Sequence, residues 1–406
     1  MVSALRLAFI GGSVESAVGK THYIATKMDR EFSLRAACFS TNEDINAISA
    51  KAFSDDAQTL RLYYNYKDLL QSEKGNIDAI CVLTPTPIHK EMVIESLLQG
   101  YAVICEKTLA LSLSEALEIM AILKQTNGFL AVIYNYTGYP MLRELKSRIK
   151  ANHLGRIHSI HIEMPQEGFI KCDDYGNAIK PQDWRLKDSY IPIVSLDLGI
   201  HCQNIISFLT DSIPLECIAL SASYGNFANV IDDVNILARY QSTIYSDIHV
   251  NMWFSKSALG FRNGLQVRIQ AENYSAIWLQ TNPEILLLSD KRGQKYIVDR
   301  ASPNCLEANK HRYNRFKAGH PAGFIEAFAN YYSDIASELR AYIQSKTGDR
   351  SLNVDSSNKD FIRDFDSPYI FGIYESLLGL AFFEGAQKSL STRSIEQIPP
   401  ISLLCT

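Results

Sequence analysis

The chain has 406 residues, of which 47% are hydrophobic and 21% are charged. A chain of this length is longer than domains with a single hydrophobic core usually are, so we expect two domains. The formal net charge is −4 and no block of lysine or arginine stands out, which disfavours nucleic acid or an anionic membrane as a partner. No apolar run approaches the roughly 18 residues of a membrane span, and the eight scattered cysteines form no CxxC pair, so we expect a cytoplasmic protein with reduced thiols.

The first 136 residues alternate between strand and helix patterns. Buried strands are predicted at 5–10, 34–40, 77–84, 102–106 and 129–135, and helices are predicted between them, including 19–29, 87–100 and 112–126. Continuous apolar strands separated by helices indicate a parallel sheet covered on both faces. We therefore assign residues 1–136 to a doubly wound, Rossmann-like domain, whose ligands are expected beyond the carboxyl ends of the strands.

From residue 137 to 406 the pattern is different. Successive strands are predicted at 157–164, 217–224, 234–240, 244–254, 265–271 and 275–280, with helices at 195–210, 322–344 and 368–390. Several strands alternate apolar with polar residues, which favours an open, mainly antiparallel sheet with one covered face. We expect a substrate-binding α/β domain that also carries a homodimer or homotetramer contact, since an uncovered sheet face favours a partner. The polar insert 348–358 is expected to be a surface loop.

The segment GGSVESAVGKTH, residues 11–22, follows the first predicted strand directly. Such a turn binds phosphate because backbone N–H groups and a helix N-terminus point at the anion, and glycine permits the close approach. Gly11 and Gly12 suit the tight turn, Ser13 stands near the place of the second glycine in G-x-G-x-x-G, and Gly19 suits the helix start. A turn without any ligand is the alternative interpretation.

The other strand ends supply further candidates for cofactor binding: Ser40, Thr84, Pro85, His89, Glu106, Lys107 and Asn135. An NAD site usually has an acidic residue after the second strand, but none occurs before Glu43, and no arginine suited to a 2′-phosphate follows closely. The pattern leaves NAD and NADP open, with a slight preference for NAD. A rigid turn between strand and helix, with no ligand, is the alternative at 84–89; it explains the prolines but not the polar residues Thr84 and His89.

Lys107 is the first chemical candidate. The strand AVICE places Glu106 and Lys107 at the edge of the sheet, directly before a turn. A lysine there is costly to desolvate without a partner, and a substrate hydroxyl or carbonyl oxygen would be one. An exposed Lys–Glu pair in a loop is the alternative.

The segment SLDLGIHCQN, residues 195–204, supplies the second group of candidate catalytic residues. Asp197 and His201 are four residues apart and share one face of a helix, and Gly199 between them is expected to leave space for a ligand. A carboxylate beside an imidazole suits proton transfer near neutral pH. A metal site would need more ligands, and no HExxH or similar cluster occurs. A buried structural Asp–His pair remains the alternative.

Two further segments combine aromatic and basic residues. Trp184 and Arg185 lie in the polar segment PQDWRLKD, where an arginine can bind a sugar or a phosphate or pack on the surface as a cation–π pair. The basic loop 311–320 contains Arg312, Arg315 and Lys317 among aromatic residues. It is either a clamp for an anionic substrate or a solvated loop.

Taken in order, the glycine loop, TPTPIH, CEKTLA, DWR and DLGIH resemble the Gfo/Idh/MocA oxidoreductase family, named for glucose–fructose oxidoreductase and inositol dehydrogenase. The resemblance covers nearly the whole chain. It implies a Rossmann domain joined to a domain with an open antiparallel sheet, and NAD(H)- or NADP(H)-dependent chemistry on sugars, inositols and sugar nucleotides. The family's motif lysine corresponds to Lys107, and its aspartate and histidine correspond to Asp197 and His201. Thr108 replaces the customary proline, and the glycine loop is longer than usual.

The expected function is therefore hydride transfer between a nicotinamide cofactor and a secondary hydroxyl or ketone. Lys107 is expected to stabilise the oxygen, His201 to exchange its proton, and Asp197 to orient His201 or contact a neighbouring hydroxyl. Three alternatives stay open: an NAD-dependent glycosidase-like enzyme, a non-catalytic NAD(P)-binding regulatory protein, and a scaffold with a vestigial pocket.

Overall fold

The computed structural model describes residues 3–54, 60–242, 247–346, 365 and 367–401. Backbone packing divides the chain into two compact units. The first unit comprises Met1–Ala110, Ser114–Gly138 and Phe324–Leu377, and the second comprises Leu111–Leu113, Tyr139–Gly323 and Leu378–Thr406. The sequence analysis assigned all residues from 137 onward to the second domain, whereas the structure groups Phe324–Leu377 with the first unit. The insert 348–358 lies outside the described residues.

The first unit is built on a parallel sheet with the strand order β3-β2-β1-β4-β5-β6. Its strands are β1 (Leu5–Gly11), β2 (Phe32–Cys38), β3 (Arg61–Leu62), β4 (Ala79–Leu83), β5 (Ala102–Glu106) and β6 (Leu130–Ile133). Every residue of β4, β5 and β6 is buried, as expected of strands covered on both faces. The predicted Rossmann-like sheet is confirmed.

The chain order reverses at β1, which lies between β2 and β4. At such a switch point the connections leave in opposite directions and open a crevice beyond the carboxyl ends of the strands. The register aligns these ends, because Gly11 pairs with Leu83 and Glu106 pairs with Ile133. The residues that follow β1, β4, β5 and β6 therefore emerge along one edge of the sheet.

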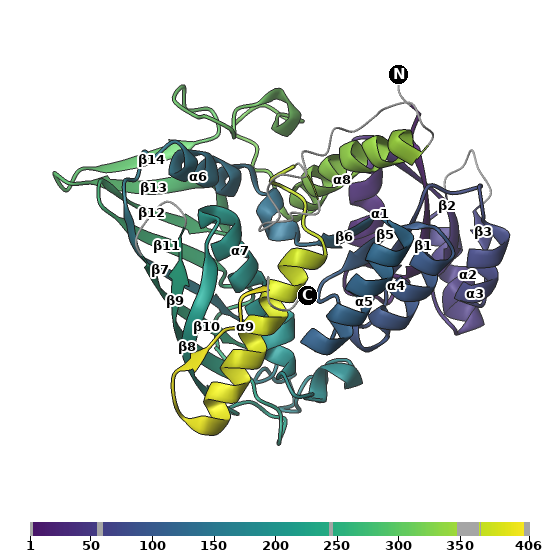
Figure 1. Cartoon of the computed structure of the whole chain (residues 1–406), viewed down its shortest axis with the longest axis horizontal. Helices are drawn as coiled ribbons and strands as arrows, with labels where there is room; N and C mark the ends of the chain where they lie inside the picture. Colours follow the sequence, from purple (N-terminus) through teal and green to yellow (C-terminus); the bar gives the residue numbers. More distant parts are fainter. Residues whose placement is uncertain (1–2, 55–59, 243–246, 347–364, 366, 402–406) are drawn as a thin grey trace. The chain divides into compact units, whose positions relative to one another are not determined.

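Helices cover the sheet of the first unit. They are α1 (Gly19–Met28), α2 (Glu43–Ala52), α3 (Tyr66–Ser72), α4 (His89–Leu98), α5 (Leu113–Thr126) and α8 (Phe324–Lys346). Helix α1 packs along α8, whereas α4 packs against β4 and β5 (Figure 1). Helix α8 is thus a late segment of the chain that completes a layer of the early domain.

The second unit is built on a nine-stranded sheet with the order β14-β13-β12-β11-β7-β10-β9-β8-β15. Its strands are β7 (Ile157–Pro165), β8 (Ile213–Ala222), β9 (Asp233–Gln241), β10 (Ile248–Ser255), β11 (Gln266–Ala271), β12 (Tyr274–Leu279), β13 (Asn282–Asp290), β14 (Lys295–Asp299) and β15 (Glu396–Gln397). All described pairings are antiparallel except that of β7 with β10. The expected mainly antiparallel sheet is confirmed.

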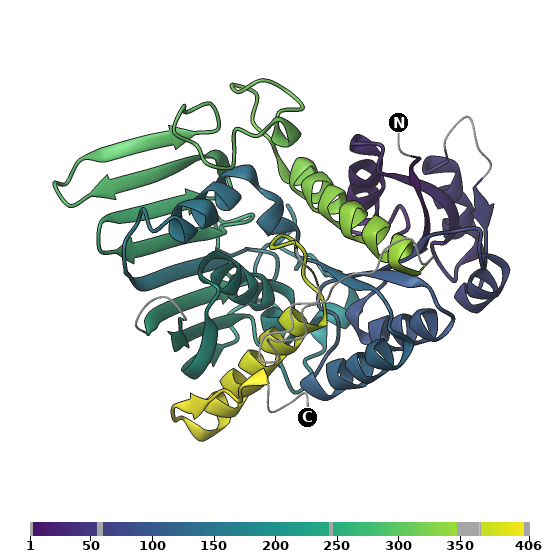
Figure 2. The same ribbon diagram turned by 45° about the horizontal axis from the view of Figure 1, so that its top comes forward.

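Helices α6 (Pro140–Lys150) and α7 (Ile200–Thr210), together with α9 (Ile373–Thr392) from Leu378 onward, lie along one face of this sheet (Figure 2). On β9, Val234, Ile236 and Tyr240 are buried while Asn235 and Leu237 are exposed. This alternation is the period of two that a half-covered strand requires. One face of the sheet is the core of the second unit, and the other carries exposed side chains.

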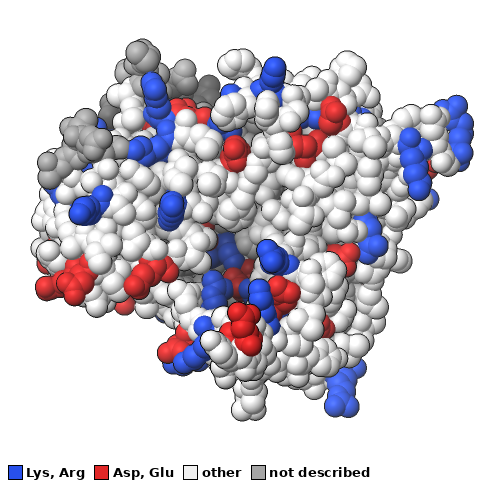
Figure 3. All heavy atoms as spheres, turned by 180° about the vertical axis from the view of Figure 1, so that it is seen from behind, with Lys and Arg blue, Asp and Glu red and all other residues white. Residues whose placement is uncertain are grey.

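Within the described residues, no helix is both long and apolar enough to cross a membrane. The seven cysteines of the described segments are free thiols, and the same segments contain no group of three metal-ligating side chains. On the face drawn in Figure 3, Lys and Arg side chains are interspersed with Asp and Glu and separated by uncharged surface.

Candidate active site

The glycine loop closes tightly on itself at the end of β1. Gly11 and Gly12 have φ values of +80° and +73°, a conformation that favours glycine. A Cβ atom at Gly11 would lie 2.7 Å from Cγ2 of Thr84, and one at Gly19 would lie 2.1 Å from the carbonyl oxygen of Gly12. The loop therefore needs glycine at both its ends, although six residues lie between Gly12 and Gly19.

Helix α1 begins at the end of this loop with features that suit an anion. Its first turn contains no acidic residue, and its N-cap residue, Val18, has no side chain that could accept a capping hydrogen bond. The hydroxyl of Ser16 accepts a hydrogen bond from the backbone N–H of Gly19 at 3.2 Å, which fixes the loop against the helix start. Exposed N–H groups and the positive end of a helix dipole are what a pyrophosphate requires. The loop thus fits the diphosphate of a dinucleotide.

The end of β2 is neutral. The hydroxyl of Ser40 accepts a hydrogen bond from the backbone N–H of Asn42 at 3.1 Å, and the side chain of Asn42 caps helix α2 by accepting from Ile45. Glu43 lies in the first turn of that helix rather than on the strand. Hydroxyl groups, not a carboxylate or a guanidinium, follow β2.

His89 ties two strand ends together. It is fully buried at the start of α4, and its ring nitrogens lie 2.7 Å from the carbonyl oxygen of Thr84 and 2.8 Å from that of Thr108. This differs from the expectation that the ring faces a ligand, because both nitrogens contact the backbone. Burial lowers the pKa of His89, so the ring is neutral at pH 7 and one nitrogen donates to one of the two carbonyls.

We expect His89 to make the protein less stable in mild acid. Because its folded pKa is lower than its ordinary value of 6.5, the unfolded chain binds the proton first, and stability falls as the pH drops below 6.5 toward the folded pKa. The free energy of unfolding, measured in urea between pH 8 and 5, should therefore decline more steeply for wild type than for His89→Gln. Parallel profiles would contradict this assignment.

Glu106 and Lys107 lie where the sequence predicts them, at the carboxyl end of β5. Glu106 is the last residue of the strand and is 7% exposed, while Lys107 is partly exposed. Oε1 of Glu106 lies 2.9 Å from Nε2 of His22, a buried residue of α1. Beyond β6, Asn135 is buried, and its Nδ2 has no hydrogen-bond partner among the described residues. Polar groups therefore follow each of the neighbouring strands.

In the second unit, two cations converge on Asp197. This residue lies on a π-helical turn, Ser195–Gly199, that leads into α7. Its Oδ2 atom is 2.5 Å from Nη1 of Arg185 and 2.8 Å from Nζ of Lys256. The structure thus couples the DWR and DLGIH motifs, which the sequence presents as separate candidates.

Lys256 is a site residue that the sequence reasoning missed. Strands β7 and β10 are parallel, and their last residues, Pro165 and Ser255, pair with each other. The next residues, Gln166 and Lys256, therefore emerge side by side, with Lys256 Nζ 2.8 Å from Gln166 Oε1. A lysine just after the end of a predicted strand was the available signal, as it was for Lys107.

His201 lies in the first turn of α7, four residues after Asp197, and is 5% exposed.

The interpretation of Gly199 as space for a ligand is wrong. A Cβ atom there would lie 2.6 Å from Cζ of Phe383 and 2.8 Å from Cζ of Phe254. Gly199 is required because aromatic rings of the core approach the backbone closely.

Trp184 and Arg185 form the cation–π pair that one of the two interpretations of the sequence expects. The guanidinium carbon of Arg185 lies 4.3 Å from the centre of the Trp184 ring, and the indole N–H donates to Gln182 at 3.1 Å. The cation–π contact holds the planar guanidinium while its Nη1 pairs with Asp197. Arg185 therefore acts on the orientation of the Asp197 carboxylate.

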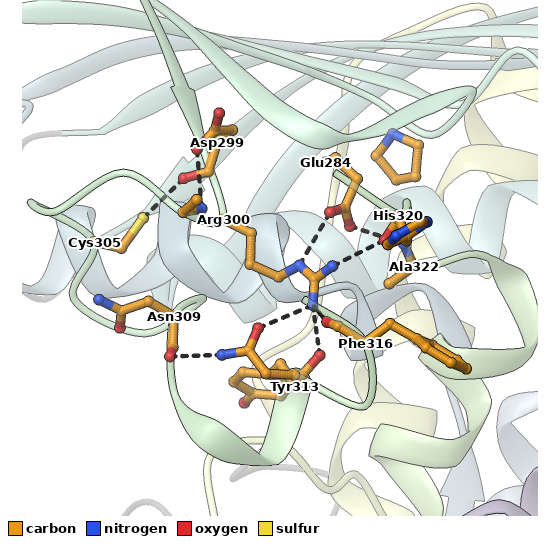
Figure 4. A network of polar contacts seen from close by, with 12 residues as sticks. Glu284, Asp299, Arg300, Cys305, Asn309, Tyr313, Phe316, His320 and Ala322 are labelled. Carbon is orange, nitrogen blue, oxygen red and sulfur yellow. Dashed lines mark hydrogen bonds and ion pairs between the residues drawn. The ribbon is translucent and has the colours of Figure 1, made fainter. Parts of the chain in front are cut away.

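The conformation of the basic loop 311–320 is set by one buried arginine. Arg300 is 2% exposed and donates to the carbonyl oxygens of Tyr313 at 2.7 Å and His320 at 3.0 Å (Figure 4). Its Nε pairs with Glu284, which also accepts from the backbone N–H of Ala322. The loop is thus a fixed part of the second unit.

Comparison with known proteins assigns the chain to a family. The family model described as "Oxidoreductase family, NAD-binding Rossmann fold" matches residues 5–134, and that described as "GFO/IDH/MocA C-terminal domain" matches residues 142–275. The chain belongs to the Gfo/Idh/MocA oxidoreductase family. It is an oxidoreductase with an NAD-binding Rossmann domain.

Curated and solved members of the Gfo/Idh/MocA family resemble this chain over much of its length. An uncharacterised oxidoreductase of Bacillus subtilis (strain 168) is 26% identical over 83% of this chain and 86% of its own. Glucose-6-phosphate 3-dehydrogenase of the same organism is 26% identical over 61% of this chain and 69% of its own. The structure of an inositol dehydrogenase homolog from Azotobacter vinelandii, complexed with NADH and myo-inositol, has a TM-score of 0.82 at 22% identity and covers 98% of each chain.

Within this family fold, we expect Gly19→Ala to disrupt dinucleotide binding. The added methyl group cannot occupy a point 2.1 Å from a backbone oxygen, so the loop or the start of α1 must move, as in an overpacked core that loses about 1–3 kcal/mol. The Kd for NADH, measured by fluorescence, should rise by about one to two powers of ten. Gly168→Ala is the control, since nothing lies within 4 Å of its Cβ position and its φ, like that of Gly19, is outside the positive range. Unchanged NADH affinity in Gly19→Ala would remove the loop from the cofactor site.

Proposed function

We propose that this oxidoreductase interconverts a secondary hydroxyl and a ketone on a sugar, inositol or sugar-nucleotide substrate. The observation that carries the proposal is the edge of the first sheet. There a closed glycine loop follows β1 and the Glu106–Lys107 pair follows β5, with β4 between them. The names of relatives, among them glucose-6-phosphate 3-dehydrogenase, support a sugar or polyol as the substrate class.

Each predicted site residue has a role in this proposal. The dinucleotide is held by Gly11, Gly12, Ser13 and Gly19 at its diphosphate and by Ser40, Thr84, Pro85, Glu106 and Asn135 along the strand ends, while His89 supports Thr84 from behind. When bound, the nicotinamide ring supplies the acceptor or donor of hydride.

The remaining residues act on the substrate. Lys107 donates a hydrogen bond to the reacting oxygen and stabilises its negative charge. His201 accepts the hydroxyl proton in oxidation and returns it in reduction. Asp197 takes a hydroxyl hydrogen bond or orients His201, and its carboxylate is held by Arg185 and Lys256. Trp184 offers an aromatic face beside Arg185, a surface on which the apolar side of a sugar ring can pack.

We further propose that NAD is preferred to NADP. A 2′-phosphate is usually met by arginine, whereas the residues after β2 are Ser40, Thr41 and Asn42. The hydroxyl of Ser40 is suited to the 2′-hydroxyl of NAD. The additional charge of NADP would find no cation in this segment.

The test begins with the purified protein and both reduced dinucleotides. Binding of NADH and NADPH is measured by fluorescence, and a set of sugars, inositols and sugar nucleotides is then followed at the nicotinamide absorbance. We expect tighter binding of NADH and turnover of at least one polyol. Sugar release without net NADH would favour the glycosidase-like alternative, and dinucleotide binding without any turnover would favour a regulatory protein. Failure to bind either dinucleotide would favour a scaffold.

We also propose a cytoplasmic homo-oligomer that joins copies through the uncovered face of the second sheet. Strand register places one row of outward residues across this face: Ile218, Leu237, Asn251, His161, Arg268, Ile277, Leu287 and Ile297. The row is apolar at both ends and polar in its middle, and Leu237 and Ile297 are 59% and 70% exposed. In a face-to-face pair with two-fold symmetry, apolar ends meet apolar ends whichever way the axis runs.

We expect Leu237→Glu to dissociate this oligomer. A carboxylate buried at a sheet-to-sheet contact is costly to desolvate, so light scattering should give one chain mass for the variant and two or four for wild type. Leu98→Glu is the matched control, because Leu98 is similarly exposed but lies on α4 of the first unit. A monomeric wild type would reject the proposal.

A further inference from the structure

A chain of buried polar side chains runs through the first unit and ends at Glu106. His22 on α1 is fully buried, and its Nδ1 lies 2.7 Å from the hydroxyl of Tyr332 on α8. That hydroxyl lies 3.3 Å from the Sγ atom of Cys81 on β4. The other ring nitrogen of His22, Nε2, lies 2.9 Å from Oε1 of Glu106. Four elements of the fold therefore each contribute one member.

Within this network of buried polar side chains, the contact between His22 and Glu106 is the one that reaches the predicted site. Among the described residues, Nε2 of His22 has no partner that satisfies hydrogen-bond geometry, although Oε1 of Glu106 lies within ion-pair distance. Burying such groups costs free energy that apolar side chains of similar size would not. The Glu106 side chain keeps 10% of its surface exposed, so the buried chain reaches the surface at the residue before Lys107.

The positions of the protons in this network place an N–H group of His22 opposite Glu106. Burial raises the pKa of Tyr332 far above its ordinary value and that of Cys81 to about 12, so both keep their protons at pH 7. If His22 is neutral, the Glu106 carboxylate, which can only accept, places the hydrogen on Nε2. Nδ1 then accepts from Tyr332, and Tyr332 accepts from Cys81. If His22 is an imidazolium, Nδ1 donates to Tyr332 and Nε2 again carries a hydrogen. Both arrangements present Nε2–H to the Glu106 carboxylate.

We propose that His22 is a positioning residue that orients the Glu106 carboxylate at the end of β5. The inference rests on the proposed dehydrogenase function, in which Lys107 acts on the substrate oxygen. A Glu106 side chain held in place by His22 fixes the end of β5, and with it the position from which the adjacent Lys107 reaches the substrate. Tyr332 in turn fixes the tautomer and ring orientation of His22, as outer partners do for ligating histidines.

Two replacements of His22 separate positioning from packing. His22→Gln retains an amide N–H that reaches the place of Nε2, whereas His22→Leu retains volume but no donor. We expect His22→Leu to lower kcat by up to about 10²-fold, as a misplaced catalytic group does, with KM little changed, and His22→Gln to recover most of the loss. Thr26→Val is the matched control, since Thr26 is a buried hydroxyl on the same helix.

A second measurement needs no bound cofactor. In the dinucleotide-free protein labelled with ¹⁵N-histidine, we expect a protonated Nε2 on His22, with a signal that shifts in Glu106→Gln and disappears in His22→Gln. Glu106→Gln also completes a double-mutant cycle. If His22 acts through Glu106, the effect of His22→Leu on kcat should largely vanish in the Glu106→Gln background.

The outcomes separate the inference from the function on which it rests. A wild type that neither binds NADH nor turns over any polyol overturns the proposed function and this inference with it. A wild type that turns over overturns the inference alone under either of two results. One is an unprotonated Nε2, and the other is an equal loss of kcat from His22→Leu with and without Glu106→Gln.

Discussion

Replacing Lys107 with methionine is expected to lower kcat by a factor of about 10²–10³, the usual loss when one donor to a developing oxyanion is removed. Methionine keeps the length of the side chain but has no charge and no N–H. The loss should therefore appear in the chemical step, while the Kd for NADH stays close to that of wild type. Steady-state kinetics with the best polyol of the screen, together with NADH fluorescence, would measure both quantities.

Lys90→Met provides the matched control for this variant. Lys90 also belongs to the first unit, but it lies on α4 and pairs with Glu118 on the surface. A surface pair of this kind contributes about 1 kcal/mol or less to stability, so the control should turn over like wild type. Wild-type turnover by Lys107→Met would instead exclude the lysine from the chemistry and leave the EKT segment as a structural turn.

The fold of the first unit was predictable because its signal is local. The run AICVL is apolar at every position and AVICE at all but its last, and the structure buries every residue of β4 and β5. Glycine and proline mark the turns between them. Helix α8 was predicted as a helix but not as part of this unit, because the period of 3.6 residues shows which face is apolar and not which surface covers it.

The candidate site was predictable at the strand ends and less so elsewhere. Topology alone brings Gly11, Thr84 and Glu106 to one edge, once the strands are known to be parallel and adjacent. Lys256 and His22 were missed because their partners, Asp197 and Glu106, are distant in sequence. Gly199 was misread because a glycine between two polar residues looks the same whether a ligand or an aromatic ring approaches it.

Replacing His201 with asparagine is expected to lower kcat by a factor of about 10²–10⁴, the range of general acid–base catalysis. Asparagine retains hydrogen bonding but cannot exchange a proton near neutral pH. The limb of the pH–rate profile that reports the base should therefore disappear, which a purely structural role would not cause. His158→Asn is the control, since His158 is an exposed residue of β7 in the same unit. A variant with the wild-type pH profile would assign the proton transfer to another group.

The double variant Lys107→Met/His201→Asn decides whether the two residues act in one step. Groups that stabilise the same transition state are strongly non-additive, so removing both costs little more than removing the more important one. We expect kcat of the double variant to lie close to that of the worse single variant. A loss equal to the product of the two single losses would show independent contributions, and then Lys107 and His201 could not share one oxygen atom of the substrate.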